Sequence, residues 1–287
     1  ARRLVGEPLN IFAGTPLAVT EGPHIYNRGG WYCLMTAEGG TGWRHAVSMA
    51  RSRRLEGPYE IDPQNPMLTS YDDCTLPLHK AGHASLTDTP DGSWYLVHLA
   101  SRPVSDKRRC ILGRETCIQE VEWTADGWLR LAGGGNRPRV EVSAPDLPAC
   151  PWPEAPARRD FDEPALPVEF QTLREPADAS WLSLSQRPGW LTLRGRASMA
   201  SRFDQSLVGR RLQGLVFEAS TCVDFSPGCF QHMAGLAGYY NTSLWHYLFV
   251  THDEQLGRCL NIGTCDNGEY TEPLGRPMAL PATGPVH

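Results

Sequence analysis

Residues 29–37 (GGWYCLMTA) and residues 91–100 (DGSWYLVHLA) share one pattern, a glycine-containing turn followed by a strand that opens with tryptophan. A shorter copy, DGWL, occupies residues 126–129. Glycine supplies the backbone angles of a hairpin turn, and aromatic and aliphatic residues suit a half-buried strand. Hairpins repeated at intervals of about 40 to 65 residues are typical of β-propeller blades. Two unrelated hairpins with a common turn would give the same pattern.

The segments around these copies predict an all-β chain. Residues 24–26 are expected to pair with the first copy, and residues 45–51 alternate in a way that indicates the next strand. No amphipathic helix longer than two turns is predicted. Prolines cluster between residues 138 and 167, which is typical of a linker. The later strands are expected at residues 181–184, 190–194, 215–225, 233–240 and 245–251.

These patterns predict three parts. Residues 1–145 are expected to form blades of a partial β-propeller, residues 146–160 a proline-rich linker, and residues 161–287 an incomplete β-sandwich. The 28 glycines, 24 prolines and nine tryptophans fit short strands, frequent turns and indole rings that could stack on sugars.

Composition excludes several classes of protein. The 27 basic residues are scattered against 32 acidic ones, so no nucleic-acid footprint is present. No apolar run is long enough to span a bilayer. The nine cysteines are odd in number and lie mostly in apolar runs, which favours reduced thiols and a cytoplasmic location. The chain opens with Ala-Arg-Arg and no initiator Met, so secretion stays open because the amino terminus looks truncated.

Four side chains are candidates for chemistry. Glu21 precedes Gly-Pro, a turn that holds its direction as a general acid requires, although an isolated glutamate there is more often an ordinary turn residue. His83 lies among small residues that leave room for a ligand, water or metal, or it is a core histidine. Arg114 beside a glycine could bind hydroxyls or form a scaffold ion pair. Glu38 could line the same opening or cap a turn.

Taken together, the ordered segments resemble a known family. The chain is similar to the later propeller blades of family 43 glycoside hydrolases, in the β-xylosidase branch, through these stretches: TEGPHIY (20–26), YCLMTAEGGT (32–41), HAVSMARS (45–52), LEGPYE (55–60), NPMLTS (65–70), KAGHAS (80–85), WYLVHL (94–99) and CILGRETCIQ (110–119). FQTLR (170–174), RPGWLTLRGR (187–196) and QHMAGLAGYYN (231–241) resemble the β-sandwich that follows in that branch.

The resemblance implies a function and roles. It implies a five-bladed propeller whose axial pocket releases terminal xylose or arabinofuranose with inversion, from xylo-oligosaccharides or arabinosides. Glu21 takes the general-acid role, while His83 and Arg114 contact substrate, with Glu38 as a further substrate-binding candidate. No cofactor is required, although in some members the residue matching His83 holds a calcium ion. Neither nucleic acid nor a membrane is expected as a partner, and a homo-oligomer stays open.

The chain also departs from the family pattern. The family's general base and a second aspartate belong to earlier blades, and residues 1–20 contain no aspartate. We therefore expect a piece truncated at both ends, with the base outside the chain, poor solubility alone and no activity until the upstream segment is restored. If the base lies inside the chain, Asp72, Asp73 and Asp88 are the candidates. The alternative is a non-catalytic carbohydrate-binding module or an inactive fragment that needs a partner chain.

Overall fold

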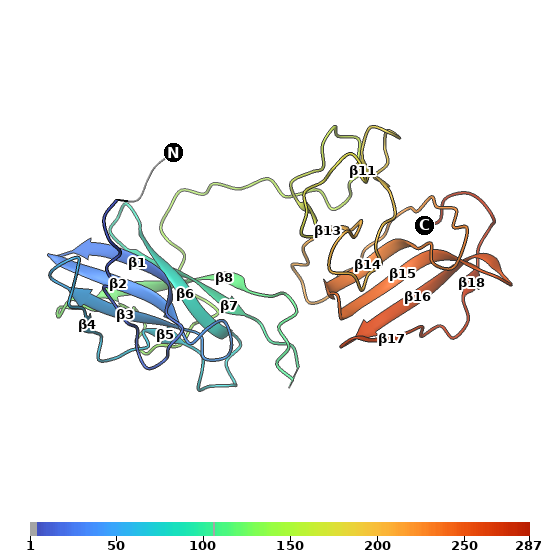
Figure 1. Ribbon diagram of the computed structural model, residues 1–287. Helices are drawn as coiled ribbons and strands as arrows, with labels where there is room; N and C mark the ends of the chain where they lie inside the picture. The colour runs from blue at the N-terminus through green and yellow to red at the C-terminus, as the bar shows by residue number, and fades with distance from the viewer. Residues whose placement is uncertain (1–4, 106) are drawn as a thin grey trace. The chain divides into compact units, whose positions relative to one another are not determined.

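The computed structural model describes residues 5–105 and 107–287, and its regular structure within them consists of β-strands (Figure 1). None of the described residues forms a helix long and apolar enough to cross a membrane. The strands, in chain order, are β1 Glu21–Arg28, β2 Trp31–Glu38, β3 Ala46–Ser52, β4 Glu60–Ile61, β5 Leu68–Thr69, β6 His79–Asp88, β7 Trp94–Ser101, β8 Glu115–Trp123, β9 Leu129–Leu131, β10 Phe170–Thr172, β11 Leu182–Ser183, β12 Thr192–Leu193, β13 Val208–Arg210, β14 Ala234–Asn241, β15 Leu244–Asp253, β16 Gly257–Asp266, β17 Glu269–Thr271 and β18 Met278–Ala279.

Two antiparallel sheets of the same design make up the first part of the chain. One runs β1-β2-β3-β4, with β5 also paired to β3, and the other runs β6-β7-β8-β9. Trp31 opens β2 and Trp94 opens β7, so the two copies of the turn-and-strand pattern are the second strands of equivalent sheets. The blue and green sheets of Figure 1 are therefore two consecutive propeller blades.

The core of this part lies between the two sheets. Strand β6, the first strand of the second sheet, packs against β2 and β3 of the first sheet. The largest fully buried apolar side chains at this interface are Met35, Met49, Leu68, Leu96 and Leu129. Burial of each such side chain contributes about 1.5–3 kcal/mol, so the interface holds the two blades together.

A second compact unit begins at Trp152. Its main sheet runs β14-β15-β16-β17, with β18 also paired to β16, and two short ladders join β10 to β13 and β11 to β12. The segments expected at 233–240 and 245–251 are strands β14 and β15, whereas those at 181–184 and 190–194 each contain only a two-residue strand.

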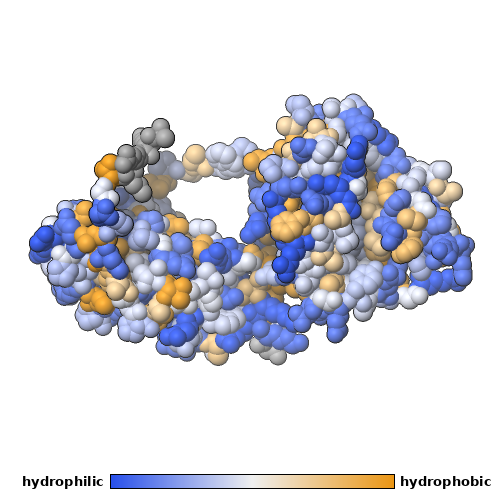
Figure 2. All heavy atoms as spheres, in the orientation of Figure 1, coloured by the Kyte–Doolittle hydropathy of each residue, from blue (hydrophilic) through white to orange (hydrophobic). Residues whose placement is uncertain are grey.

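One predicted strand of the second unit is wrong. Residues 215–225 form no strand and make only an isolated bridge, Val223 with Val286. Val216 is 91% exposed and Phe217 is 52% exposed. An apolar run becomes a strand only when its backbone groups pair with a neighbour, and beyond that bridge none of the described segments pairs with this run. Figure 2 shows orange, hydrophobic groups scattered among the blue on the face in view.

The cysteines are less buried than their apolar neighbours predicted. All nine are free thiols, but only Cys33, Cys259 and Cys265 are buried. Of the six that are not buried, Cys117 lies on β8 and the other five lie between strands, in segments that run over the surface: Cys74, Cys110, Cys150, Cys222 and Cys229. Apolar neighbours in the sequence therefore do not by themselves place a cysteine in a core.

Candidate active site

The KAGHAS segment forms the irregular first half of β6. Its partner register runs from His79–Ser101 to Gly82–Leu99 and then to Ser85–Val97, so β6 gains one extra residue at each step. Lys80 and His83 take the left-handed conformation there, with φ of 55° and 51°. Bulges of this kind turn a side chain out of its regular direction and are common beside active sites. The two bulges thus set the direction in which His83 points.

Glu21 lies beside His83 because a glycine allows close approach. Strand β1 begins at Glu21 with its own bulge, between the Glu21–Ala37 and His24–Met35 pairs. Gly22 has a φ of 50°, and a Cβ atom placed on it would lie 2.5 Å from Nε2 of His83. The imidazole ring therefore rests on the backbone next to Glu21, whose side chain is exposed. Only glycine satisfies both the φ angle and the contact.

His45, just before β3, is a site residue that the sequence reasoning missed. Its ring lies against Gly82, where an added Cβ would be 2.6 Å from the ring, and its centroid is 6.4 Å from that of His83. Nδ1 of His45 is 3.0 Å from the carbonyl oxygen of Lys80, which can only accept, so Nδ1 carries the proton. The signal available was a histidine entering a strand of small residues, which sequence alone cannot separate from a core histidine.

Several of the candidate side chains act on the pKa of His45. Burial lowers the pKa of His45, and the positive charges of His83 and Arg114 lower it further. The carbonyl of Lys80 and the charge of Glu21 act on this pKa in the opposite direction. The side chains that act on this pKa come from β1, β6 and the segment just before β8.

Arg114 precedes β8 and is exposed. The neighbouring acid, Glu115, is already paired with Arg102 at 2.8 Å. Within residues 5–105 and 107–287, Arg114 makes no ion pair within 4 Å. The scaffold ion pair that the sequence left open is therefore not seen in this range.

Glu38, the fourth candidate, lies in the interior and does not line an opening. Its residue is 0% exposed, and its carboxylate accepts hydrogen bonds from Thr15, Thr20 and Ser48. Burial raises the pKa of Glu38, but these hydrogen bonds outweigh it and hold the pKa below its ordinary value. The predicted substrate contact for Glu38 is corrected to a structural role, since its oxygens are already occupied by protein donors.

The residues around His83 do not fit a metal ion held by the protein alone. No group of three or more His, Cys, Asp or Glu side chains in the described part of the chain could hold one. Calcium takes six to eight oxygen ligands, whereas the ring that lies nearest to His83 in the described residues is a second imidazole, that of His45. Among the described residues, His83 could therefore supply only one ligand to such an ion.

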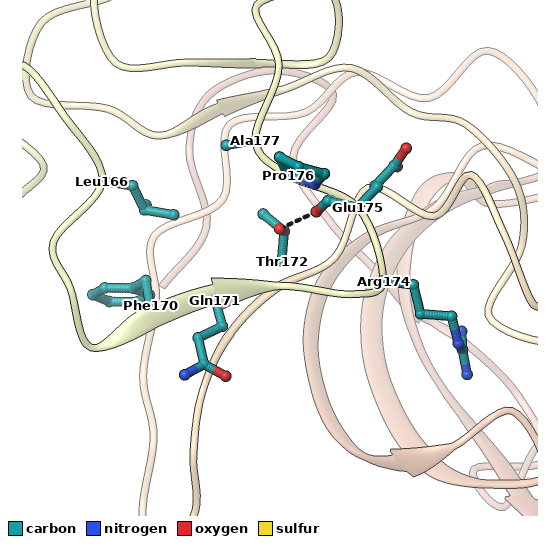
Figure 3. Close-up of a pocket in the computed structure, with 8 residues that line it drawn as sticks. All are labelled: Leu166, Phe170, Gln171, Thr172, Arg174, Glu175, Pro176 and Ala177. Atoms are coloured by element: carbon teal, nitrogen blue, oxygen red, sulfur yellow. Dashed lines mark hydrogen bonds between the residues drawn. The ribbon is translucent and has the colours of Figure 1, made fainter. Parts of the chain in front are cut away.

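A surface hollow on the second unit carries no comparable set of groups (Figure 3). Of its charged lining residues, Glu175 pairs with Arg196, and Arg174 donates to the carbonyl oxygen of Arg202 at 2.7 Å. The Thr172 hydroxyl donates to the backbone carbonyl of Glu175. These groups are engaged by the scaffold, so the candidate chemistry stays with Glu21, His83, His45 and Arg114.

Comparison with known families gives the arrangement its context. The family described as "Glycosyl hydrolases family 43" matches residues 1–129, and "Beta xylosidase C-terminal Concanavalin A-like domain" matches residues 158–287. The chain belongs to glycoside hydrolase family 43. The two matches in this order account for a propeller followed by a β-sandwich, the fold class expected from the sequence.

Individual family 43 relatives are similar along nearly the whole chain. A protein named "Beta-xylosidase" from Bacillus subtilis is 45% identical over 98% of the chain and 54% of its own length. "Xylosidase/arabinosidase 43B" from Humicola insolens is 44% identical over 100% of the chain and 53% of its own length. The crystal structure of xylan β-1,4-xylosidase from Bacillus halodurans superposes with a TM-score of 0.91 at 49% identity, covering 97% of this chain and 53% of that one. The chain thus spans about half the length of these relatives.

Proposed function

We propose that the chain supplies the general-acid side of an inverting, exo-acting glycosidase that removes terminal xylose or arabinofuranose from xylan-derived oligosaccharides. The observation that carries the proposal is the place of Glu21, an exposed carboxyl group at a bulge, on backbone that lies against the imidazole ring of His83. The names of the relatives, β-xylosidase and xylosidase/arabinosidase, support the substrate class.

In this proposal each side chain has a separate task. The Glu21 carboxyl group donates its proton to the glycosidic oxygen as the bond to the sugar breaks. A water molecule attacks the anomeric carbon from the opposite face and loses its proton to a carboxylate, and Glu21 regains a proton from solvent. Arg114 donates hydrogen bonds to sugar hydroxyls, and His83 orients the sugar or the water.

The carboxylate that activates water lies, in this proposal, outside residues 1–287. An inverting pair is about 6.5–9.5 Å apart, with the water between them. Asp88 is five residues beyond His83 along β6, roughly 16 Å at the usual rise per residue. Asp72 is paired with Arg137, and Asp73 accepts hydrogen bonds from Thr75. The carboxyl groups that the sequence offered as internal bases are therefore distant or engaged.

The proposed reaction needs no cofactor, because carboxyl groups and water carry both proton transfers. Neither proton transfer in this proposal runs through calcium, since the described residues around His83 do not complete a site. A melting temperature that rises with calcium in the wild type, but not in His83→Ala, would show that an ion binds with ligands from outside these residues.

The test uses the protein as its gene encodes it. Xylobiose and aryl arabinofuranosides are supplied as substrates, and the anomer formed first is identified by NMR. We expect α-xylose from a β-xyloside, together with loss of that activity in Glu21→Gln. Retention of the β-configuration would contradict the inverting mechanism. Binding of xylo-oligosaccharides without any hydrolysis would instead support the rival function, a carbohydrate-binding module.

A further inference from the structure

The loop in front of Glu21 has an unfavourable backbone conformation. Ala18 and Val19 are both in the left-handed region, with φ of 60° and 51°. Left-handed angles are rare for residues other than glycine, and rarer still for a β-branched residue such as valine. Such a conformation persists only where surrounding contacts hold it. The structure of the loop must therefore be maintained by groups outside it.

Glu38, at the end of β2, provides those contacts. Its Oε1 accepts a hydrogen bond from the backbone N–H of Thr15 at 2.7 Å and another from the Thr20 hydroxyl at 2.9 Å. Its Oε2 accepts from the Thr15 hydroxyl and, at 2.7 Å, from Ser48 on β3. The next backbone N–H, that of Gly39, donates to the carbonyl of Ala18 at 2.8 Å. One buried carboxylate thus joins both ends of the loop to the sheet.

The close packing of the loop shows that the connection is specific. A Cβ atom on Gly14 would lie 2.1 Å from the Thr20 hydroxyl and 3.1 Å from Oε1 of Glu38. The donors to Glu38 are neutral, and they favour its charged form because a carboxylate accepts at both oxygens whereas an amide accepts at only one. Replacing the carboxylate by an amide therefore breaks the network while preserving the size of the side chain.

We infer that Glu38 is a positioning residue for Glu21: by binding Thr15 and Thr20, it holds the strained loop and fixes where the adjacent Glu21 side chain enters the site. The inference rests on the proposed function, in which Glu21 is the general acid. It assigns Glu38 to the reaction without any contact with substrate.

The first experiment measures hydrogen exchange in the protein as its gene encodes it. In Glu38→Gln, the peptide covering residues 15–22 should exchange faster than in the wild type, while peptides from β7 and β8 stay unchanged. Thr20→Val, which removes one hydroxyl, should show the same local change to a smaller extent. Ser48→Ala is the matched control, because Ser48 donates to Glu38 without belonging to the loop. In this variant the peptide covering residues 15–22 should exchange as in the wild type. Equal exchange in Glu38→Gln and wild type would overturn the inference.

The second experiment uses kinetics. Misplacement of a catalytic group by about 1 Å can reduce the rate about 10²-fold. We expect Glu38→Gln to lower kcat on xylobiose by about that factor, to lower it far less on an activated aryl xyloside, and to leave KM nearly unchanged. An equal loss on both substrates would indicate general destabilisation and contradict positioning. If Glu38→Gln does not fold, Thr20→Val decides by the same two readouts. An inactive wild type would refute the proposed function, while the exchange experiment would still judge the positioning role.

Discussion

Nε2 of His83 lies against the backbone of Gly22, so closely that a Cβ on that glycine would be 2.5 Å away. The contact joins the first strands of two consecutive blades, β1 and β6, directly beside Glu21. An imidazole and a carboxyl group that are 62 positions apart in the sequence thus become neighbours. This relationship gives the first prediction.

Gly22→Ala should displace His83 and reduce hydrolysis. The substitution makes a methyl group clash with the imidazole ring of His83, and it puts a non-glycine residue at a φ of 50°. Together these changes should lower the free energy of unfolding by about 1–3 kcal/mol. Gly29→Ala is the matched control, since Gly29 has a φ of 56° and open space around its Cβ position. In Gly22→Ala the melting temperature and kcat on xylobiose should both fall. In Gly29→Ala only the melting temperature should fall. Equal activity in the two variants would argue against a contact between His83 and the site.

Glu21→Gln should affect substrates according to their leaving groups. Positioned proton transfer contributes about 10²–10⁴ in rate, and only a poor leaving group needs it in full. We expect a loss in that range on xylobiose and a much smaller loss on a nitrophenyl xyloside, measured as kcat/KM for each. The same loss on both substrates would remove Glu21 from the general-acid role.

Arg114→Ala should weaken inhibition by xylose with little effect on folding. A hydrogen bond from a charged donor contributes about 1.5–3 kcal/mol, so the inhibition constant should rise about tenfold or more. Arg102→Ala is the matched control: Arg102 lies nearby in sequence but pairs with Glu115 at 2.8 Å. Its removal should change stability by only about 0–1 kcal/mol and leave inhibition unchanged. A large drop in melting temperature for Arg114→Ala with unchanged inhibition would assign Arg114 to the scaffold.

The free energy of unfolding of the first unit should depend on pH through His98. Burial lowers the pKa of this residue, its Nδ1 lies 3.0 Å from the carbonyl oxygen of Leu99, and Nε2 is buried without a hydrogen-bond partner among the described residues. The unfolded state therefore binds a proton at higher pH than the folded state does. The free energy of unfolding should fall as pH drops below about 6.5 and level off below the folded pKa.

Urea unfolding followed by tryptophan fluorescence at pH 7.5 and pH 5.5 measures this effect. His98→Phe should show a smaller decrease in stability between the two pH values than the wild type. The comparison between the two proteins removes the contributions of other titrating groups, including His45, whose charge acts on His98. An unchanged decrease in the variant would show that His98 does not titrate differently in the folded state.

Local sequence signals were sufficient for the fold class and for several strands. The turn-and-strand pattern that opens with Trp31 and Trp94 predicted β2 and β7 because turn angles and strand preference are properties of a few adjacent residues. The absence of helical periodicity likewise predicted an all-β chain. The motifs around Glu21, His83 and Arg114 indicated the family, since their order along the chain is itself visible in the sequence.

Tertiary structure decided the features that depend on distant segments. The sequence left Glu38 either lining an opening or capping a turn, but its carboxylate is buried and accepts hydrogen bonds from residues 15, 20 and 48. His45 could not be identified as a site residue until the bulged β6 brought Gly82 against its ring. Residues 215–225 have the composition of a strand but make only an isolated bridge among the described residues. Burial and pairing arise from contacts between residues far apart in the chain, so the local pattern does not determine them.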